Sequence, residues 1–310
     1  FTMPQKNNLR VFPEIKRVVI LGDSGFIGTH LYGHFKKVYP GLELLGFSFP
    51  KLDLAKKEDA LSLAQVFDAQ TLVIMCSGIK KQWGDNLDNF SQNLSMAENI
   101  CTLLEKNPVR RFVYFSSAEV YGEDTENSQI SENTPVNPTS FYGIAKFASE
   151  RLLKKTIQPG GETSLLILRP STVYGPGDSS KGYGPVGFLE SILQKKEVSL
   201  WGDGQELREF VFVHDLVKAV AALAFCDYAG VVNIASGKSR KFKEILEIIL
   251  KVVPLSFQTN SRPRTKHKVD QVFSNDLLRK LLPGFSFTTL EKGIEQIYLE
   301  EYKQLTQVKV

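Results

Sequence analysis

The stretch that decides the fold lies near the start of the chain and reads Arg17-Val18-Val19-Ile20-Leu21-Gly22-Asp23-Ser24-Gly25-Phe26-Ile27-Gly28. Its first part is a short apolar run of the kind that fills a buried parallel strand. Its second part has the spacing Gly22-x-x-Gly25-x-x-Gly28 and passes directly into an amphipathic stretch, Thr29 to Val38. Glycines in this context permit a tight turn and let a pyrophosphate rest on the N–H groups of a helix N-terminus. The segment therefore predicts a dinucleotide-binding strand, turn and helix.

The same alternation of strand and helix continues along the chain. Further strands are predicted at Leu42–Gly46, Thr71–Met75, Phe112–Ser116, Leu165–Arg169 and Val231–Ile234. Between them lie segments with helical periodicity, such as Phe90 to Leu104 and Phe141 to Leu153. Strands that alternate with helices over such a length indicate βαβ units. We therefore expect an α/β fold with a doubly wound parallel sheet of the Rossmann type.

After Tyr174 the character of the sequence changes. Residues 175–185 form a glycine-rich loop that is too long for a simple turn, and long loops in compact domains are usually functional. Two amphipathic helices are predicted further on, Phe242 to Ile249 and Leu290 to Tyr298, the second opened by the capping pattern Thr288-x-x-Glu291. We expect a dinucleotide-binding domain over 14–174, to which 211–236 return. A smaller, mostly C-terminal α/β lobe over 175–210 and 237–306 would bind the substrate.

Composition and charge exclude several classes of protein. The chain has 310 residues, of which 42% are hydrophobic and 23% charged, enough apolar content for a folded core. Its net charge of +4 comes from scattered Lys and Arg, and the densest basic cluster, Arg262 to Lys268, is too small to indicate nucleic-acid binding. No apolar run approaches the ~20 residues of a membrane span, and we expect no signal peptide. We expect a cytoplasmic protein that contacts neither nucleic acid nor membrane.

Cysteine and histidine usage gives no indication of a disulfide framework or a metal site. The three cysteines, Cys76, Cys101 and Cys226, lack CxxC spacing and are expected to be reduced and mostly buried. The chain has four histidines: His30, His34, His214 and His267. None has HxxxH or HExxH spacing with an acidic ligand, so we expect packed or solvated side chains and no bound metal.

The strongest catalytic signal is Tyr142-Gly143-Ile144-Ala145-Lys146, preceded by Ser116-Ser117-Ala118-Glu119-Val120-Tyr121-Gly122 at the end of a predicted strand. The spacing of four places the Tyr142 hydroxyl and the Lys146 ammonium on one helix face. A neighbouring cation favours the phenolate, so the pKa of Tyr142 should fall from about 10 toward working pH. Tyr142 can then move a proton to or from an alcohol or sugar oxygen, and Ser117 would hydrogen-bond the same oxygen.

The end of the second predicted strand bears on the choice of cofactor. Binding of the NAD ribose normally uses an Asp or Glu there, whereas this chain reads Gly46-Phe47-Ser48. No acidic side chain there would repel the 2′-phosphate of NADP, and this slightly favours NADP. However, the only nearby groups that could bind that phosphate are Ser24, Ser48 and Lys51. Asp53 is a candidate contact to the adenine edge, with an ordinary loop Asp as the alternative. The candidate cofactor-binding residues are Gly22, Ser24, Gly25, Phe26, Ile27, Gly28, Ser48, Asp53, Leu54, Tyr142 and Lys146.

These motifs, with the segments Leu168–Pro176 and Trp201–Asp215, resemble the extended short-chain dehydrogenase/reductase family over about residues 17–300. Within it they are similar to the branch of nucleotide-sugar epimerases, dehydratases and 4-ketoreductases. The resemblance implies a bound NAD(P), a catalytic set at Ser117, Tyr142 and Lys146, and a nucleoside-diphosphate sugar in the C-terminal lobe. It also implies that Arg208 grips the sugar nucleotide's phosphates, and that helices at Phe90–Glu105 and Ser140–Leu153 form a homodimer.

Two positions in this comparison concern the substrate. Glu119 stands where 4,6-dehydratases and sugar-acid decarboxylases carry a Glu for proton transfer at the ring, although the Asp that some dehydratases place before it is Ala118 here. Thr172 replaces the family's usual Asn contact to the sugar nucleotide. The candidate substrate-binding residues are Lys80, Thr172, Tyr183 and Arg208. Lys80 follows a predicted strand together with Lys81, Gln82 and Trp83. These residues are candidates to line the nicotinamide end of the site, with a plain exposed loop as the alternative.

The predicted function is an NAD(P)-dependent nucleoside-diphosphate-sugar oxidoreductase or epimerase, with 4-keto reduction or epimerisation of an NDP-hexose as the leading reaction. Simple keto reduction needs only Ser117, Tyr142 and Lys146. The acid/base Cys of epimerising 4-ketoreductases is Glu119 here, and residues 177–183 contain no His to match their second ring acid. A 4,6-dehydratase or decarboxylase that uses Glu119 is the alternative. A third hypothesis is a non-catalytic NAD(P) sensor, a class that typically loses the Tyr/Lys pair.

Overall fold

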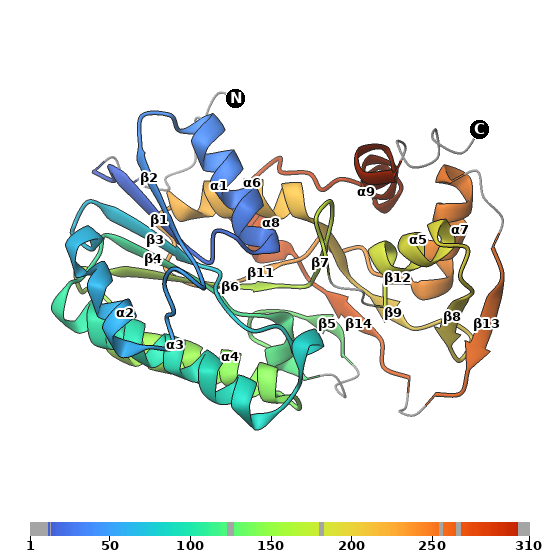
Figure 1. Ribbon diagram of the computed structural model, residues 1–310, viewed down its shortest axis with the longest axis horizontal. Coiled ribbons are helices and arrows are strands. Elements are labelled where there is room, and N and C mark those ends of the chain that lie inside the picture. Colours follow the sequence, from blue (N-terminus) through green and yellow to red (C-terminus); the bar gives the residue numbers. More distant parts are fainter. Residues whose placement is uncertain are drawn as a thin grey trace.

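A computed structural model describes Phe12 and residues 14–122, 127–179, 183–253, 257–264 and 268–302. The centre of the fold is a six-stranded sheet in the order β11-β6-β4-β3-β1-β2, in which every pairing is parallel (Figure 1). Its strands are β1 (Arg17–Leu21), β2 (Glu43–Phe47), β3 (Thr71–Met75), β4 (Arg111–Phe115), β6 (Ser164–Pro170) and β11 (Gly230–Ile234). Each predicted strand is confirmed to within one residue at either end, and so is the doubly wound α/β class.

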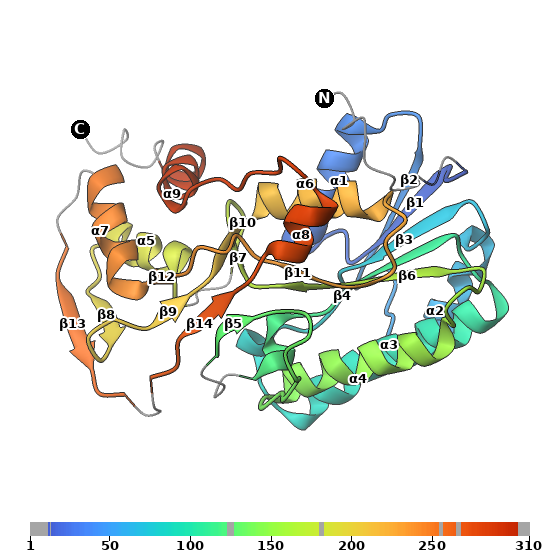
Figure 2. The same ribbon diagram turned by 180° about the vertical axis from the view of Figure 1, so that it is seen from behind.

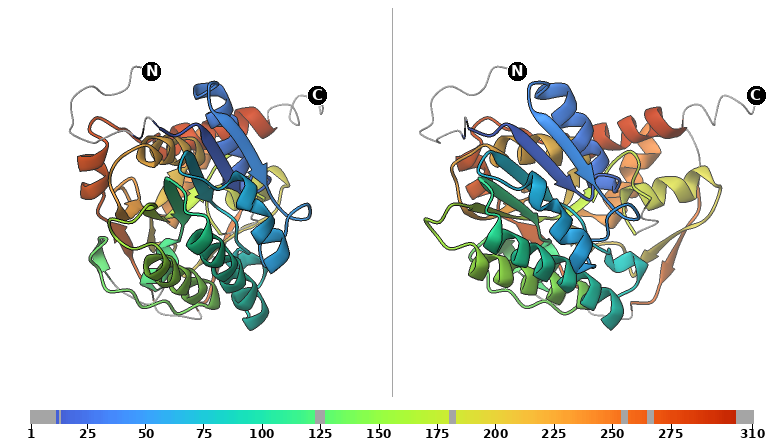
Figure 3. Two further views of the ribbon diagram at one scale, coloured as in Figure 1. Left: turned by 90° about the vertical axis from the view of Figure 1, so that its left-hand side faces the viewer. Right: turned by 60° about the vertical axis from the view of Figure 1, so that its left-hand side comes forward.

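Helices cover both faces of this sheet, as Figures 1 and 2 show. One face packs against α1 (Phe26–Val38), α6 (Val213–Ala224) and α8 (Asp276–Leu281). The other packs against α2 (Lys57–Leu61), α3 (Leu87–Lys106) and α4 (Phe141–Thr156), and α3 and α4 lie side by side (Figure 3). The predicted helices at Phe90 to Leu104 and Phe141 to Leu153 are therefore confirmed within α3 and α4.

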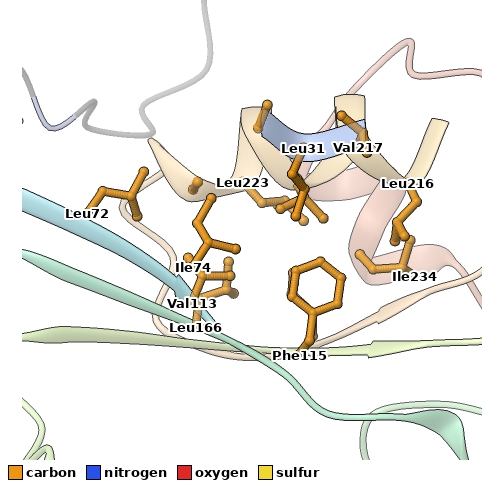
Figure 4. Close-up of a cluster of buried hydrophobic side chains, with 14 of the residues drawn as sticks. Leu31, Leu72, Ile74, Val113, Phe115, Leu166, Leu216, Val217, Leu223 and Ile234 are labelled. Carbon is orange, nitrogen blue, oxygen red and sulfur yellow. The ribbon is translucent and has the colours of Figure 1, made fainter. Parts of the chain in front are cut away.

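The apolar run of β1 supplies both cores. Side chains alternate across a strand, so Val18 and Ile20 enter the core beneath α1 and α6, whereas Val19 and Leu21 enter the opposite core. Figure 4 shows the first of these cores, where Leu31 of α1 and Leu216 of α6 close over Ile74 and Val113. Each fully buried side chain of this size contributes about 1.5–3 kcal/mol to folding.

A second, smaller group of elements lies beside the sheet, on the right of Figure 1. Its core joins α5 (Pro185–Leu193), α7 (Phe242–Val252) and α9 (Leu290–Ile297) with β8 (Val198–Trp201). The remaining strands pair two by two: β7 (Thr172–Tyr174) with β10 (Phe210–Phe212), β9 (Leu207–Arg208) with β12 (Arg240–Lys241), β13 (Thr259–Arg262) with β8, and β14 (Gln271–Phe273) with β5 (Asn127–Ile130). Four short helices complete the described elements: η1 (Ser62–Val66), η2 (Lys81–Trp83), η3 (Ala118–Tyr121) and η4 (Tyr298–Tyr302).

The two C-terminal helices are present, but the cap of the second one was predicted wrongly. The N-cap of α9 is Thr289, whose hydroxyl accepts a hydrogen bond from the Lys292 amide. The preceding Thr288 instead donates its amide to the Asp215 carboxylate on α6. This tertiary hydrogen bond fixes where the helix begins, and the local capping pattern does not contain that information.

The predicted division into two lobes stays a proposal, and the chain crosses between the two groups of elements several times. From the C-terminal region, α8 returns to the sheet and buries Leu278 and Leu281 in its core. All three cysteines are free, with Cys76 partly buried and the other two buried. His30 on α1 contacts His214 on α6 edge-on, at 5.1 Å between ring centroids, and His267 lies outside the described residues. Within the described part of the chain, no helix is long and apolar enough to cross a membrane.

Candidate active site

A cavity of about 610 Å³ opens at the carboxyl ends of the central strands. Residues that follow β1, β3, β4 and β6 line its floor, and Tyr183–Gly187 with Glu209 and Gln271 line the opposite side. In open α/β sheets ligands bind outside the carboxyl ends of the strands, at the point where the strand order reverses. Here β1 lies between β2 and β3, so the winding reverses at the glycine turn.

The glycine turn is shaped so that two of its glycines cannot be replaced. Gly22 has a φ of +94°, and a Cβ at Gly28 would lie 2.7 Å from the Gly22 carbonyl carbon. Gly25 is the N-cap of α1 and has no side-chain hydrogen bond to the helix amides. A close, uncapped helix N-terminus is suited to an anionic group. The turn therefore fits a dinucleotide pyrophosphate, and Ser24, Phe26 and Ile27 line the cavity with it.

Ser117, Tyr142 and Lys146 line the same cavity as this turn. Ser117 follows β4, and it lies close enough to the Tyr142 phenol, at the start of α4, to lower the pKa of that phenol. One helical turn on, the Lys146 ammonium lies 5.7 Å from the Tyr142 ring centroid and donates to the Phe115 carbonyl at 2.8 Å. The backbone amide of Tyr142 donates to the Asp85 carboxylate at 3.0 Å, which fixes the first turn of α4.

The electrostatics of this set differ from the sequence-based prediction. Burial raises the pKa of Tyr142, the Glu119 carboxylate raises it further, and only the Ser117 hydrogen bond lowers it. Burial also lowers the pKa of Lys146 to about 8. The prediction that a nearby cation lowers the pKa of Tyr142 is therefore wrong for this state of the protein. The phenol is desolvated, and the ammonium is directed to a backbone carbonyl.

Glu119 lines the same cavity and has partners of its own. Its carboxylate forms an ion pair with the Lys81 ammonium at 3.4 Å and lies 3.5 Å from the Ser140 hydroxyl. Lys81 belongs to η2, which follows β3, so the pair joins two separate strand ends. Glu119 is thus close enough to Tyr142 to influence its protonation, and its charge is partly offset by Lys81.

A buried ion pair holds α4 against the sheet beneath Lys146. Glu150 on α4 is fully buried and accepts two hydrogen bonds from the guanidinium of Arg169 on β6, at 2.8 and 2.6 Å. The Ser116 hydroxyl at the end of β4 also donates to Glu150. Charge-assisted bidentate bonds of this kind fix geometry strongly. Two central strands therefore set the position of the helix that carries Tyr142 and Lys146.

Three of the four predicted substrate-binding residues line the cavity. The Lys80 ammonium lies 3.8 Å from the Asp178 carboxylate and 5.2 Å from the Phe26 ring centroid, which joins the turn to the loop after β7. Thr172 is exposed at the start of β7, and the Tyr183 hydroxyl accepts from the Trp201 amide at 2.9 Å.

Arg208 does not line the cavity. Its guanidinium donates to the carbonyls of Leu207 at 2.9 Å and Val269 at 2.6 Å, and it forms an ion pair with Glu206. A role for Arg208 at the substrate phosphates stays a prediction, because in this conformation its donors are directed to other parts of the chain.

The three cofactor candidates near β2 also lie outside the cavity lining. The Ser48 hydroxyl accepts from the Ser24 amide at 3.2 Å and donates to the Asp23 carboxylate. Asp53 accepts from the Ala55 amide at 3.0 Å, the local hydrogen bond of an ordinary loop Asp, and Leu54 is buried. Contacts of these residues with adenosine stay predictions.

Several features of the site had no sequence signal, although Lys81 itself was a candidate for the cavity lining and does line it. Lys81 could not be recognised as the partner of Glu119, because a loop and a distant strand end supply the two residues. Cys76 lines the floor after β3, and burial raises the pKa of its thiol to about 12. Asp85, which fixes Tyr142, lies in the connection to α3. Only the fold brings these residues to the site.

With this geometry in place, comparison with known proteins identifies the family. A family model described as NAD dependent epimerase/dehydratase family matches residues 18–235. The chain belongs to the NAD-dependent epimerase/dehydratase family. It is therefore an enzyme of the extended short-chain dehydrogenase/reductase type, as its motifs predicted.

Individual relatives are distant but extend over most of the chain. An uncharacterized UDP-glucose epimerase of Bacillus subtilis (strain 168), YtcB, is 27% identical over 83% of this chain and 86% of its own length. GDP-mannose 3,5-epimerase 1 of Oryza sativa subsp. indica is 25% identical over 100% of this chain and 88% of its own length. The crystal structure of a Thermus thermophilus UDP-glucose 4-epimerase in complex with NAD is 25% identical, with a TM-score of 0.78 over 91% of this chain and 97% of that one.

Proposed function

We propose that this family member transfers hydride and protons on a nucleoside-diphosphate hexose, by 4-keto reduction or epimerisation with NAD(P). The observation that carries the proposal is that Ser117, Tyr142 and Lys146 line the same cavity as the glycine turn. The nucleotide-sugar epimerases among the relatives support the same class of substrate.

The turn from Gly22 to Gly28 would hold the cofactor pyrophosphate on the first amides of α1. When bound, the cofactor supplies or accepts the hydride. Tyr142, whose raised pKa keeps its phenol protonated at neutral pH, donates a proton to the sugar carbonyl oxygen during reduction. Ser117 hydrogen-bonds the same oxygen and stabilises the charge that develops there. Lys146 keeps a positive charge behind the phenol and fixes the turn of α4 that carries it.

The substrate would lie between this set and the C-terminal elements. Thr172 and Tyr183 face it from there, and Lys80 contributes a cation at the phosphate side. Arg208 is proposed to bind the substrate phosphates, which requires exchange of its bond to Glu206. A homodimer through α3 and α4 and a cytoplasmic location are further proposals that rest on the sequence.

A second candidate is a 4,6-dehydratase or decarboxylase that uses Glu119 for proton transfer at the sugar ring. The observation in its favour is that the Glu119 carboxylate lines the cavity and acts on the pKa of Tyr142. A reductase differs from a dehydratase in stoichiometry, because it consumes reduced cofactor with each turnover whereas a dehydratase regenerates it internally. An epimerase also regenerates its cofactor, and its product differs from that of a dehydratase because no water is lost. The intact Ser117, Tyr142 and Lys146 set argues against a non-catalytic sensor.

The test combines ligand binding with turnover. The full chain is screened by thermal shift against NAD(H), NADP(H) and GDP-, dTDP-, UDP- and CDP-sugars, since a bound ligand raises the melting temperature. Substrates that bind are then incubated with the wild type, Tyr142→Phe and the control Tyr39→Phe, and both the oxidation of reduced cofactor and the conversion of the sugar to its epimer are measured. We expect Tyr142→Phe alone to lose about 100-fold or more in turnover. A chain that binds no dinucleotide, or a Tyr142→Phe variant with full turnover, contradicts the proposal.

A further inference from the structure

We propose that Asp23 takes the place of the acidic residue that β2 lacks, binds the adenosine ribose and makes the enzyme select NAD over NADP. The inference rests on the proposed function only in that a dinucleotide binds at the glycine turn. It reverses the slight preference for NADP drawn from β2 alone, because the deciding carboxylate comes from the turn and not from the strand.

The Asp23 side chain crosses from the turn to the end of β2. In the register of the sheet, Gly46 on β2 lies beside Ile20 on β1, three residues before Asp23. A Cβ at Gly46 would lie 2.6 Å from the Asp23 Cγ, so the carboxylate occupies the space directly over Gly46. Dinucleotide-binding folds place the ribose-binding acid about 20 residues after the glycine motif, which is this end of β2. The Asp23 carboxylate therefore occupies the position, at the end of β2, where other dinucleotide-binding folds place their acidic side chain.

The carboxylate is fixed there and keeps capacity for a ligand. The Ser48 hydroxyl donates to Oδ1 of Asp23 while it accepts the Ser24 amide at 3.2 Å. A carboxylate offers about four acceptor positions, and Ser48 fills one. Asp23 is partly exposed, so a ligand on the glycine turn can reach it. A ribose hydroxyl pair can donate to such a group, whereas a 2′-phosphate cannot.

Charge also favours NAD at this position. In the described part of the chain, no Lys, Arg or His nitrogen lies within 4.0 Å of the Asp23 carboxylate, and Lys51 is exposed in the following turn. A 2′-phosphate carries about −1.5 to −2 at neutral pH, so next to Asp23 it would meet an uncompensated like charge. Such juxtaposition is strongly unfavourable in a binding site.

The test measures binding of NAD and NADP to the full chain by isothermal titration calorimetry, without substrate. We expect the wild type to bind NAD about 10- to 100-fold more tightly than NADP, and Asp23→Asn to reduce that ratio about tenfold or more. Glu43→Gln, at the opposite end of β2, serves as the matched control and should keep the ratio. The double variant Asp23→Ser/Gly46→Asp moves the acid onto the strand, where the space over Gly46 is now open, and should restore the preference.

Each outcome is decisive. If the wild type binds NADP as tightly as NAD, or if Asp23→Asn binds normally and keeps the wild-type ratio, the role of Asp23 is overturned while the proposed function stands. If neither dinucleotide binds, the proposed function fails and the inference fails with it. Restoration by the double variant separates a role at the ribose from an effect of Asp23 on the fold of the turn.

Discussion

Lys146→Met should remove a pH dependence of stability that the buried ammonium creates. Lys146 is 4% exposed, and burial lowers the pKa of its ammonium from 10.5 to about 8. Each pKa unit corresponds to about 1.4 kcal/mol, so at neutral pH the protonated group costs the folded state about 3 kcal/mol. Met fills a similar volume without charge, but it leaves the Phe115 carbonyl without its donor, which costs about 1–3 kcal/mol.

At neutral pH, removal of the buried charge and loss of the donor to the Phe115 carbonyl nearly cancel in the free energy of unfolding. The prediction therefore concerns how the stability difference between the two proteins changes with pH. Between about pH 8 and about pH 10.5 the unfolded chain binds the Lys146 proton and the folded chain has released it, so the free energy of unfolding rises with pH. The variant lacks this contribution. From about pH 7 to about pH 9.5, the wild type should therefore gain about 2 kcal/mol of stability relative to Lys146→Met.

The assay is urea unfolding of the two proteins without ligands over this pH range, followed by circular dichroism. Lys155→Met, which removes an exposed lysine of the same helix, is the control and should parallel the wild type. Lys146→Met should also lose catalytic turnover, so that stability and activity separate at one position. Unfolding free energies of wild type and Lys146→Met that change in parallel with pH would refute the reasoning.

Three further predictions concern other parts of the site. Glu119→Gln should move the pH–rate profile that reports Tyr142 to lower pH, because the carboxylate raises the pKa of the phenol; complete loss of turnover would instead favour the dehydratase chemistry. Gly28→Ala should abolish dinucleotide binding in a fluorescence titration, whereas Gly33→Ala on the exposed face of the same helix, with open space around its Cα, should bind normally. Arg169→Met should destabilise the protein by about 3–5 kcal/mol in urea unfolding, because it leaves a buried carboxylate unpaired; a loss below about 1 kcal/mol would contradict this.

Local patterns predicted the fold and the centre of the site. The run from Arg17 to Leu21 is apolar on both faces and is followed at once by the glycine spacing, so neighbouring residues alone specify the strand, turn and helix. The spacing of Tyr142 and Lys146 likewise depends only on helix geometry. Contacts between distant segments carry no such signal. The carboxylate of Asp23 reaches Gly46 only because two strands pair in one register.

The direction in which a side chain points could not be predicted from the sequence either. A cation four residues from Tyr142 predicted a lowered pKa, but the Lys146 ammonium is bonded to a strand-end carbonyl and burial dominates. Arg208 was expected at substrate phosphates, and its guanidinium is bonded to backbone carbonyls and Glu206. The predicted start of α9 at Leu290 is confirmed, but its N-cap is Thr289 and not Thr288, because Asp215 on another helix accepts the Thr288 amide.

The hydrogen bonds from two strands to Glu150 affect the entropy change when a substrate binds. Because Ser116 and Arg169 fix the register of α4 in the free protein, the helix turn with Tyr142 and Lys146 is ordered before any ligand arrives. A substrate that docks there does not lose free energy in ordering the reacting groups. The binding energy of its nucleotide portion is then available to orient the sugar ring.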